Sequence, residues 1–225
     1  MTAGAGRTLD LTQPFFHNGG FNPDLPLPRI DITRSVISDG YSLEQLELCT
    51  HVGTHMDAPS HVLETGHPID EFAVDRFHGP GVVVDLRDLG DEQAIDAELL
   101  ASRARIEGQG SIVLLATGWG AFRARSARYV DGSPWLNEAG AQWLVEHGAA
   151  GVAIDHFSIA GRGPAEKVLP AHNVLLGAGV WIVEEALFPE ALFDGSRWEV
   201  VALPWRIAGA SGAPTRMIAI EQLAG

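Results

Sequence analysis

Four side chains that can bind metal ions or move protons stand close together near residue 55. Within the eleven residues HVGTHMDAPSH they are His51, His55, Asp57 and His61. On a helix, His51 and His55 would share one face at positions i and i+4, as in zinc proteases of the H-E-x-x-H type. Gly53 and Pro59 in the same stretch disfavour a helix, and a glycine permits a tight bend. We therefore expect a bent loop that begins at the end of a strand.

On such a loop, His51, His55 and Asp57 can converge as two imidazoles and one carboxylate. Three ligands leave coordination positions open for water or substrate, as a catalytic metal requires. Zn²⁺, Mn²⁺ and Fe²⁺ all accept these donors. The alternative is a solvated loop of polar residues, because most surface histidines bind nothing. The spacing of the ligand-type residues around bend-forming residues favours the metal site.

The composition is typical of one folded domain, which we expect to span residues 1–225. Hydrophobic residues make up 46% of the 225 residues, and the formal net charge of −14 disfavours binding to nucleic acid. No apolar run approaches the roughly 20 residues that cross a bilayer, and the first residues lack the apolar core of a signal peptide. The single cysteine, Cys49, agrees with a reducing compartment and is expected in a buried strand. We expect a cytoplasmic protein that does not bind membranes.

Hydrophobic periodicity predicts a mixed α/β domain. Strands, of which the first two are expected to be half-buried, are predicted over residues 29–36, 42–50, 81–87, 111–119, 151–155, 199–209 and 216–223. Helices are predicted over 94–105 and 137–149, the second with Asn137 as its N-cap and Gly148 as its stop. The β-α-β-α-β order of the middle third favours central sheet layers flanked by helices.

Residues 12–28 contain four prolines, two adjacent glycines and three phenylalanines, so we expect an ordered loop there. Such a loop could cover a pocket. Its Phe16, Phe21 and His17 are candidate substrate-binding residues, because aromatic faces suit a flat aromatic substrate. The phenylalanines could instead only pack the loop onto the core. His156, beside Asp155 at a predicted strand end, is a further candidate for the pocket wall.

The stretch at residues 51–61 matches all seven fixed letters of the signature H-x-G-T-H-x-D-x-P-x-H. The chain thereby resembles the metal-dependent cyclase family, which includes bacterial kynurenine formamidases and isatin hydrolases. GVAIDHFSIAG, AHNVLLGAGVWIVEEAL and GAPTRMIAI look like further family segments, so the resemblance runs from about residue 8 to 220. It implies a swivelling β/β/α-like fold and a homodimer or larger assembly.

The resemblance implies a role for each matching residue. The implied metal ligands are His51, His55, Asp57, His172 and Glu184, with Asp57 able to bridge two ions, and His61 is implied in proton transfer. In a strand formed by VWIVEE, Glu184 and Glu185 would point to opposite faces, so that only one could reach the site. The family spacing selects Glu184. His172, taken alone, is expected in a loop.

The resulting hypothesis is a metal-dependent hydrolase of the kynurenine formamidase type. It would cleave an amide outside peptides, in an aryl formamide or a cyclic amide, with Zn²⁺ expected, Mn²⁺ as the alternative, and one or two ions bound. Metal-activated water would attack, and neutral His61 would carry the proton to the leaving nitrogen. The family resemblance implies an aromatic amide as substrate and a role in tryptophan catabolism. The alternatives are a metal-dependent cyclase or lyase that stabilises an enolate, with His61 moving the proton, and a structural metal site or binding module without catalysis.

Overall fold

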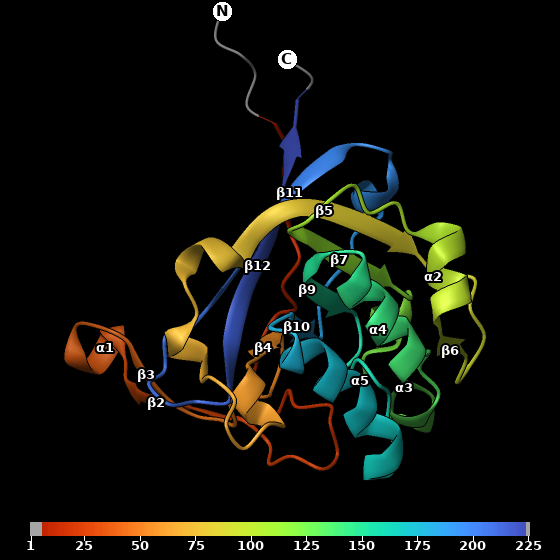
Figure 1. Ribbon diagram of the computed structural model, residues 1–225. Coiled ribbons are helices and arrows are strands. Elements are labelled where there is room, and N and C mark those ends of the chain that lie inside the picture. Colours follow the sequence, from red (N-terminus) through yellow and green to blue (C-terminus); the bar gives the residue numbers. More distant parts are fainter. Residues whose placement is uncertain (1–5, 224–225) are drawn as a thin grey trace, which may run out of the picture.

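The computed structural model describes residues 6–223, and an eight-stranded mixed sheet is its main feature (Figure 1). In pairing order the strands are β1 (Thr8–Asp10), β12 (Gly212–Gln222), β11 (Arg197–Pro204), β5 (His78–Asp85), β7 (Ser111–Ala116), β9 (Ala149–Ile154), β10 (Trp181–Glu184) and β4 (His55–Asp57). Strand β4 also pairs with β12, so the sheet closes on itself like a barrel. The α/β fold expected from the sequence is confirmed, and the closure through β4 is an addition to it.

Helices α2 (Ala97–Arg103), α4 (Glu138–Glu146) and α5 (Ala165–Gly177) cover the outer face of the parallel strands β5, β7, β9 and β10 (Figure 1). Asn137 caps α4 as predicted, with its side chain accepting a hydrogen bond from Gly140 N. The predicted helix 94–105 is shorter, because residues 94 and 95 form β6 (Ala94–Ile95), paired with β8 (Trp135–Leu136). Asp96 then caps α2. Helix α3 (Ala127–Asp131) and five 3-10 helices are short; the latter are Pro59–His61, Ile69–Glu71, Val74–Phe77, Trp119–Phe122 and Glu190–Phe193.

Two hydrophobic cores lie on the two sides of the sheet. In β7, Val113 and Leu115 pack against the helices, whereas Ile112 and Leu114 belong to the core inside the curved sheet. Both sets are fully buried. The uninterrupted apolar run of β7 therefore reflects a strand that is covered on both faces, as is usual in parallel sheets.

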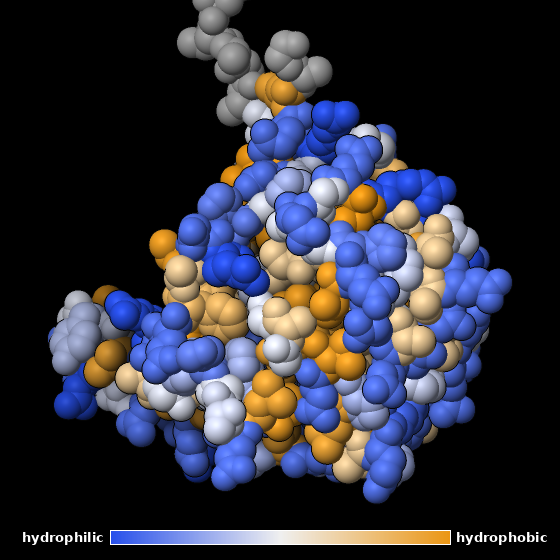
Figure 2. Space-filling model, in the orientation of Figure 1, coloured by the Kyte–Doolittle hydropathy of each residue, from blue (hydrophilic) through white to orange (hydrophobic). Residues whose placement is uncertain are grey.

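The first two predicted strands pair with each other away from the main sheet. Strands β2 (Arg29–Arg34) and β3 (Leu43–Glu47) form a two-stranded antiparallel sheet, with α1 (Val36–Asp39) at its tip. We call residues 29–47 the hairpin arm; it projects from the body of the molecule (Figures 1 and 2). The prediction that these strands are half-buried is wrong, because nearly every residue of the pair is exposed. Alternation of apolar and polar residues shows that each strand has an apolar and a polar face, but it does not show which part of the protein covers the apolar face.

Three further expectations from the sequence are wrong. Residues 51–61 are not one loop, because His55 and Asp57 lie in strand β4 and His61 ends a 3-10 helix. Cys49 lies after β3, partly exposed and outside any strand. His172 lies in helix α5, not in a loop, although Pro170 stands inside that helix. A proline removes one backbone hydrogen bond and therefore disfavours a helix in a prediction from sequence. The buried Leu175 and Leu176 nevertheless pack α5 onto the sheet. Residues 12–28 form a loop as predicted, with only an isolated bridge between Thr12 and Ala186.

Within residues 6–223, no helix has both the length and the apolar character that crossing a bilayer requires.

Candidate metal centre

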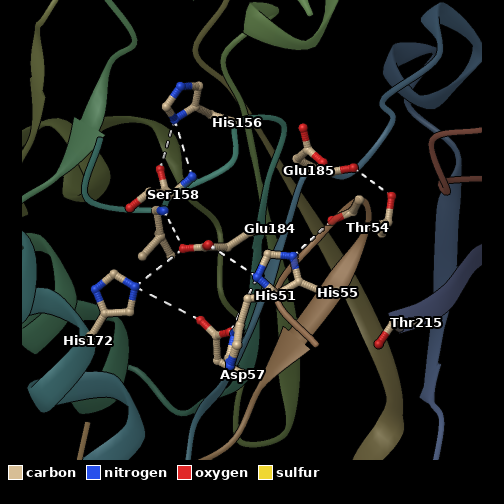
Figure 3. Close-up of polar contacts among 12 residues, drawn as sticks. His51, Thr54, His55, Asp57, His156, Ser158, His172, Glu184, Glu185 and Thr215 are labelled. Atoms are coloured by element: carbon tan, nitrogen blue, oxygen red, sulfur yellow. Dashed lines mark hydrogen bonds and ion pairs between the residues drawn. The ribbon is translucent and has the colours of Figure 1, made fainter. Parts of the chain in front are cut away.

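The closure of the sheet brings the candidate ligands together. His55 and Asp57 stand two residues apart in β4, so their side chains share one face of that strand. Strand β10 pairs antiparallel with β4 and places Glu184 directly opposite His55. Helix α5 packs beside β10 and adds His172 (Figure 3). Residues far apart in the chain therefore meet at one buried position.

A bend before β4 orients His55. Gly53 has a φ of +68°, a left-handed conformation that a glycine adopts without strain. Its carbonyl oxygen lies 2.8 Å from Nδ1 of His55, which donates to it. Nε2 of His55 is then free to act as a ligand, and it lies 3.4 Å from Asp57 Oδ1 and 3.5 Å from Glu184 Oε2. A backbone acceptor that sets the tautomer in this way is usual for metal-binding histidines.

His172 is oriented by the same device. Its Nδ1 lies 2.9 Å from the carbonyl oxygen of Val168, one turn earlier in α5. Its Nε2 lies 3.3 Å from Glu184 Oε1 and 3.9 Å from Asp57 Oδ2 (Figure 3). The helix thus presents one ring nitrogen towards both carboxylates.

His51 and His61 form a second group around Asp57. Nδ1 of His51 lies 2.8 Å from Asp57 Oδ1, and its Nε2 lies 3.0 Å from Ser211 Oγ. The rings of His51 and His61 have centroids 4.1 Å apart. Ser211 was not singled out in the sequence; the only signal was its position next to the family-like segment GAPTR.

The buried charged groups change the pKa values of their neighbours. Burial opposes ionisation of Asp57, but His51 and His55 hold the pKa of Asp57 well below its ordinary value. Burial and Asp57 oppose ionisation of Glu184, yet His172 and His55 lower the pKa of Glu184 overall. Both acids are therefore carboxylates at neutral pH, as metal ligands must be.

The pKa values of the histidines shift in two directions. Burial opposes protonation, but Asp57 and Glu184 raise the pKa of His55 well above its ordinary value, and Glu184 and Asp57 raise the pKa of His172 to about 9. Partial burial against the neighbouring rings lowers the pKa of His61. Without a metal ion, His55 and His172 thus carry protons at neutral pH, whereas His61 is neutral.

The arrangement fits a divalent cation. Asp57 Oδ2 is buried and has no hydrogen-bond partner among the described residues, which is costly for a carboxylate oxygen. Ligand atoms lie within 4.8 Å of one another in two sets that share Asp57: one with His55 and Glu184, the other with His51 and His61. Zinc bonds of about 2.0–2.1 Å in tetrahedral geometry separate neighbouring ligand atoms by roughly 3.4 Å. The contacts of His55 with both carboxylates and of His172 with Glu184 lie close to that spacing.

Glu184 and Glu185 diverge as predicted, although β10 ends at Glu184 and the expected strand over residues 180–185 does not reach Glu185. Glu184 faces His55 and His172, whereas the Glu185 carboxylate points away from them towards Tyr129, whose hydroxyl donates to it at 3.2 Å (Figure 3). Glu185 follows the end of β10 with a φ of +51°. Its carboxylate therefore belongs to a different cluster from that of Glu184.

The four candidate substrate-binding residues do not form one cluster as the candidate metal ligands do. Phe21 is half-buried and packs edge-on against Tyr129, while Phe16 is exposed and packs edge-on against Phe21. Nδ1 of exposed His17 accepts a hydrogen bond from Ile30 N at 3.1 Å. His156 is fully buried, with Nε2 2.8 Å from the Tyr129 carbonyl oxygen and Nδ1 3.3 Å from Ser158 N. Both ring nitrogens of His156 are thus used by the backbone, and a contact of His156 with substrate stays a prediction.

Comparisons with known proteins point to one family. The model of the Cyclase family matches residues 9–160. Kynurenine formamidase from Salinibacter ruber is 30% identical over 179 residues, covering 79% of this chain and 79% of that protein. Cyclase-like protein 3 from Oryza sativa subsp. japonica is 29% identical over 230 residues, covering 97% of this chain and 81% of that protein. The solved structure of isatin hydrolase A from Ralstonia solanacearum has a TM-score of 0.83 at 22% identity, covering 96% of this chain and 92% of that one, and so shares the fold.

The protons on His55 and His172 lead to the first prediction, on metal binding. Titration of metal-free protein with ZnCl₂ at pH 7.5 should release about two protons per site, because an imidazole must lose its proton to bind an ion. The release should fall as pH rises past the pKa of about 9 of His172. Calorimetry in buffers of different ionisation enthalpy measures it.

The matched variants for this test are His172→Gln and His78→Gln. His172→Gln should release about one proton fewer, whereas His78→Gln, at an exposed histidine paired only with Glu199, should behave as the unaltered protein. Binding without proton release at pH 7.5 would contradict the assignment of these ligands.

Proposed function

This chain belongs to the Cyclase family, and from that premise we propose that it is a metal-dependent hydrolase that cleaves an amide bond outside peptides. The proposed substrate is a small aryl formamide or cyclic amide. The carrying observation is the buried carboxylate of Asp57, which is shared by two sets of ligand atoms and has an oxygen without a hydrogen-bond partner among the described residues. The names of the similar proteins, a kynurenine formamidase and an isatin hydrolase, agree with this chemistry.

The residues proposed to hold one or two divalent ions are His51, His55, Asp57, His172 and Glu184, with Zn²⁺ as the expected ion and Mn²⁺ as the alternative. When bound, such an ion supplies a Lewis acid that polarises a carbonyl group and lowers the pKa of water towards about 7. Three imidazoles and two carboxylates would leave a positive centre if two ions bind, which favours hydroxide over water.

His61 is proposed as the proton carrier. It lies at the exposed edge of the centre, beside His51 and with its ring centroid 6.0 Å from that of His172. Its pKa is lowered, so the ring is neutral at pH 7 and a ring nitrogen can accept a proton. His61 can therefore take a proton from the attacking water and return it to the leaving nitrogen.

The loop of residues 12–28 is proposed as the substrate wall. Phe16 and Phe21 supply aromatic faces, and Arg123 lies 4.3 Å from the centroid of the Phe21 ring. An aromatic amide would suit such a wall. His17 stands on the same loop, and its contact with Ile30 N ties the loop to the hairpin arm.

A cyclase or lyase reaction is the second candidate. The name of the family and that of Cyclase-like protein 3 favour it. The same ligands would serve, with His61 moving a proton from carbon and no water added to the product. The two reactions differ in the source of the product oxygen.

The second prediction tests the reaction itself. Protein reconstituted with Zn²⁺ or Mn²⁺ should hydrolyse at least one of N-formylkynurenine, isatin and a simple aryl formamide. In H₂¹⁸O, hydrolysis must place label in the carboxylate, because water supplies that oxygen. Mass spectrometry of the product measures the label. Product without label would favour the lyase, and no turnover of any of the three would overturn the amide hydrolase.

The third prediction concerns His61. His61→Ala should lower kcat at least about 100-fold, since a positioned proton carrier contributes that much or more. Metal content by elemental analysis should stay unchanged. His67→Ala, at an exposed histidine paired with Glu71, is the matched control and should keep full activity. Loss of metal from the His61→Ala protein would show that His61 is a ligand, as its grouping with His51 and Asp57 allows.

A homodimer formed through the hairpin arm is a further part of the proposal. Apolar side chains gather on the arm and are exposed: Ile32, Val36, Ile37, Tyr41, Leu43 and Leu46. A two-stranded sheet with both faces in water is marginally stable, and an apolar patch of this kind usually marks a protein interface. Figure 2 shows the arm standing clear of the body, where a second copy could cover it.

The cytoplasmic location stays a prediction that cell fractionation would test.

The fourth prediction tests this interface. Ile37, at the tip of the arm, is 99% exposed, and Ile37→Asp should weaken the dimer about tenfold or more by removing buried apolar area. Light scattering after size exclusion measures the mass over a dilution series. Val74→Asp, at a valine that is 73% exposed on the body, should leave the mass unchanged. An unaltered protein that is a monomer at every concentration would contradict the proposal.

A further inference from the structure

A buried ion pair lies beside the candidate metal centre and takes no part in it. The Glu185 side chain is 2% exposed and the Arg123 side chain 8% exposed. Arg123 Nε lies 3.4 Å from Glu185 Oε1, and Nη2 lies 3.5 Å from Oε2, so one edge of the guanidinium faces the two carboxylate oxygens. The Tyr129 hydroxyl donates to the same carboxylate. Burying such an ion pair costs free energy. Its presence therefore needs an explanation, which the other contacts of Arg123 supply.

Arg123 contacts the 12–28 loop with the rest of its guanidinium. Its Nη1 donates to the Pro14 carbonyl oxygen at 3.4 Å. Its carbon Cζ lies 4.3 Å from the centroid of the Phe21 ring and 6.0 Å from that of Phe16. A planar cation over an aromatic ring is attracted to it, more strongly where water is excluded. One side chain therefore joins the end of β10 to two separate points of the loop.

The backbone around Glu185 ties the same loop to β4. The Thr54 hydroxyl donates to the Glu185 carbonyl oxygen at 2.6 Å and accepts a hydrogen bond from Gln13 N at 2.9 Å (Figure 3 shows the first contact). Thr54 precedes His55, and Glu185 follows Glu184. The beginning of the loop is thus bonded to the immediate neighbours of two candidate metal ligands.

We propose that Arg123 and Glu185 are positioning residues that form a clamp, which holds residues 12–28 as a fixed wall beside the metal centre. Glu185 supplies the charge that keeps the Arg123 guanidinium inside the protein, and Arg123 supplies the contacts to Pro14 and Phe21. The adjacent acids then have separate tasks, with Glu184 directed to the metal and Glu185 to the wall. The clamp rests on the proposed function only in taking the loop as the substrate wall.

The fifth prediction tests the clamp by hydrogen exchange, without substrate. In Arg123→Met, amides of residues 15–21 should exchange at least tenfold faster, because the loop loses its contacts at Pro14 and Phe21. Arg162→Met is the matched control. Arg162 also pairs with the loop, through Asp24, but its side chain is 39% exposed, so its loss should change exchange little. Unchanged exchange of residues 15–21 in Arg123→Met would overturn the proposal.

A double variant separates positioning from stability. Arg123→Met alone leaves a buried carboxylate unpaired and should lower the Tm, whereas Arg123→Met with Glu185→Gln removes both charges and should restore much of it. Fast exchange of the loop should persist in the double variant, because the contacts to Pro14 and Phe21 are still absent. Recovery of slow exchange together with the Tm would show that the pair is only structural.

Kinetics and metal content complete the test. Arg123→Met should raise KM at least tenfold with kcat within about threefold, and its metal content should equal that of the unaltered protein. Faster exchange in a protein that hydrolyses no amide would count against the proposed function and leave the clamp standing. Unchanged exchange in an active Arg123→Met enzyme would reject the clamp and leave the function standing.

Discussion

The burial of two carboxylates side by side is the constraint on which the rest of the structure depends. Asp57 and Glu184 lie on paired strands, both nearly without exposure, and Asp57 opposes the ionisation of Glu184. Isolated buried carboxylates are unstable, so imidazoles surround them and hold them ionised. One oxygen of Asp57 still has no partner among the described residues. A bound cation is the natural complement of such a cluster, because it offsets negative charge that protonated histidines otherwise balance.

Strand β4 connects this cluster to the hydrophobic core. It has only three residues, yet it pairs on one side with β10 and on the other with β12. His55 and Asp57 face the metal centre, while Met56 between them is buried in the core inside the curved sheet. The pleat of a strand forces this division, since successive side chains point to opposite faces. The core therefore holds the ligands in place, and the precision of the site depends on the closure of the sheet.

Neighbouring residues beside the candidate metal centre make different contacts. Glu184 and Glu185 point apart because the strand ends between them and the chain turns with a positive φ. The second acid then pairs with Arg123, and that guanidinium reaches the 12–28 loop. Exposed apolar residues gather instead on the hairpin arm, where a second copy of the chain would cover them. The proposed metal binding, substrate contact and assembly thus use separate parts of one fold.

Much of the candidate centre could be predicted from the sequence, because its first part is local. The spacing of His51, His55 and Asp57 around Gly53 requires a bend, and the φ of +68° at Gly53 bears this out. Strands and the capped helix α4 also follow from local periodicity and capping. Only the tertiary structure decided that β4 closes the sheet against β12, that His172 stands on a helix despite Pro170, and that the hairpin arm is exposed. The physical reason is that hydrophobic alternation shows which faces a segment has, whereas long-range pairing and packing decide what covers each face.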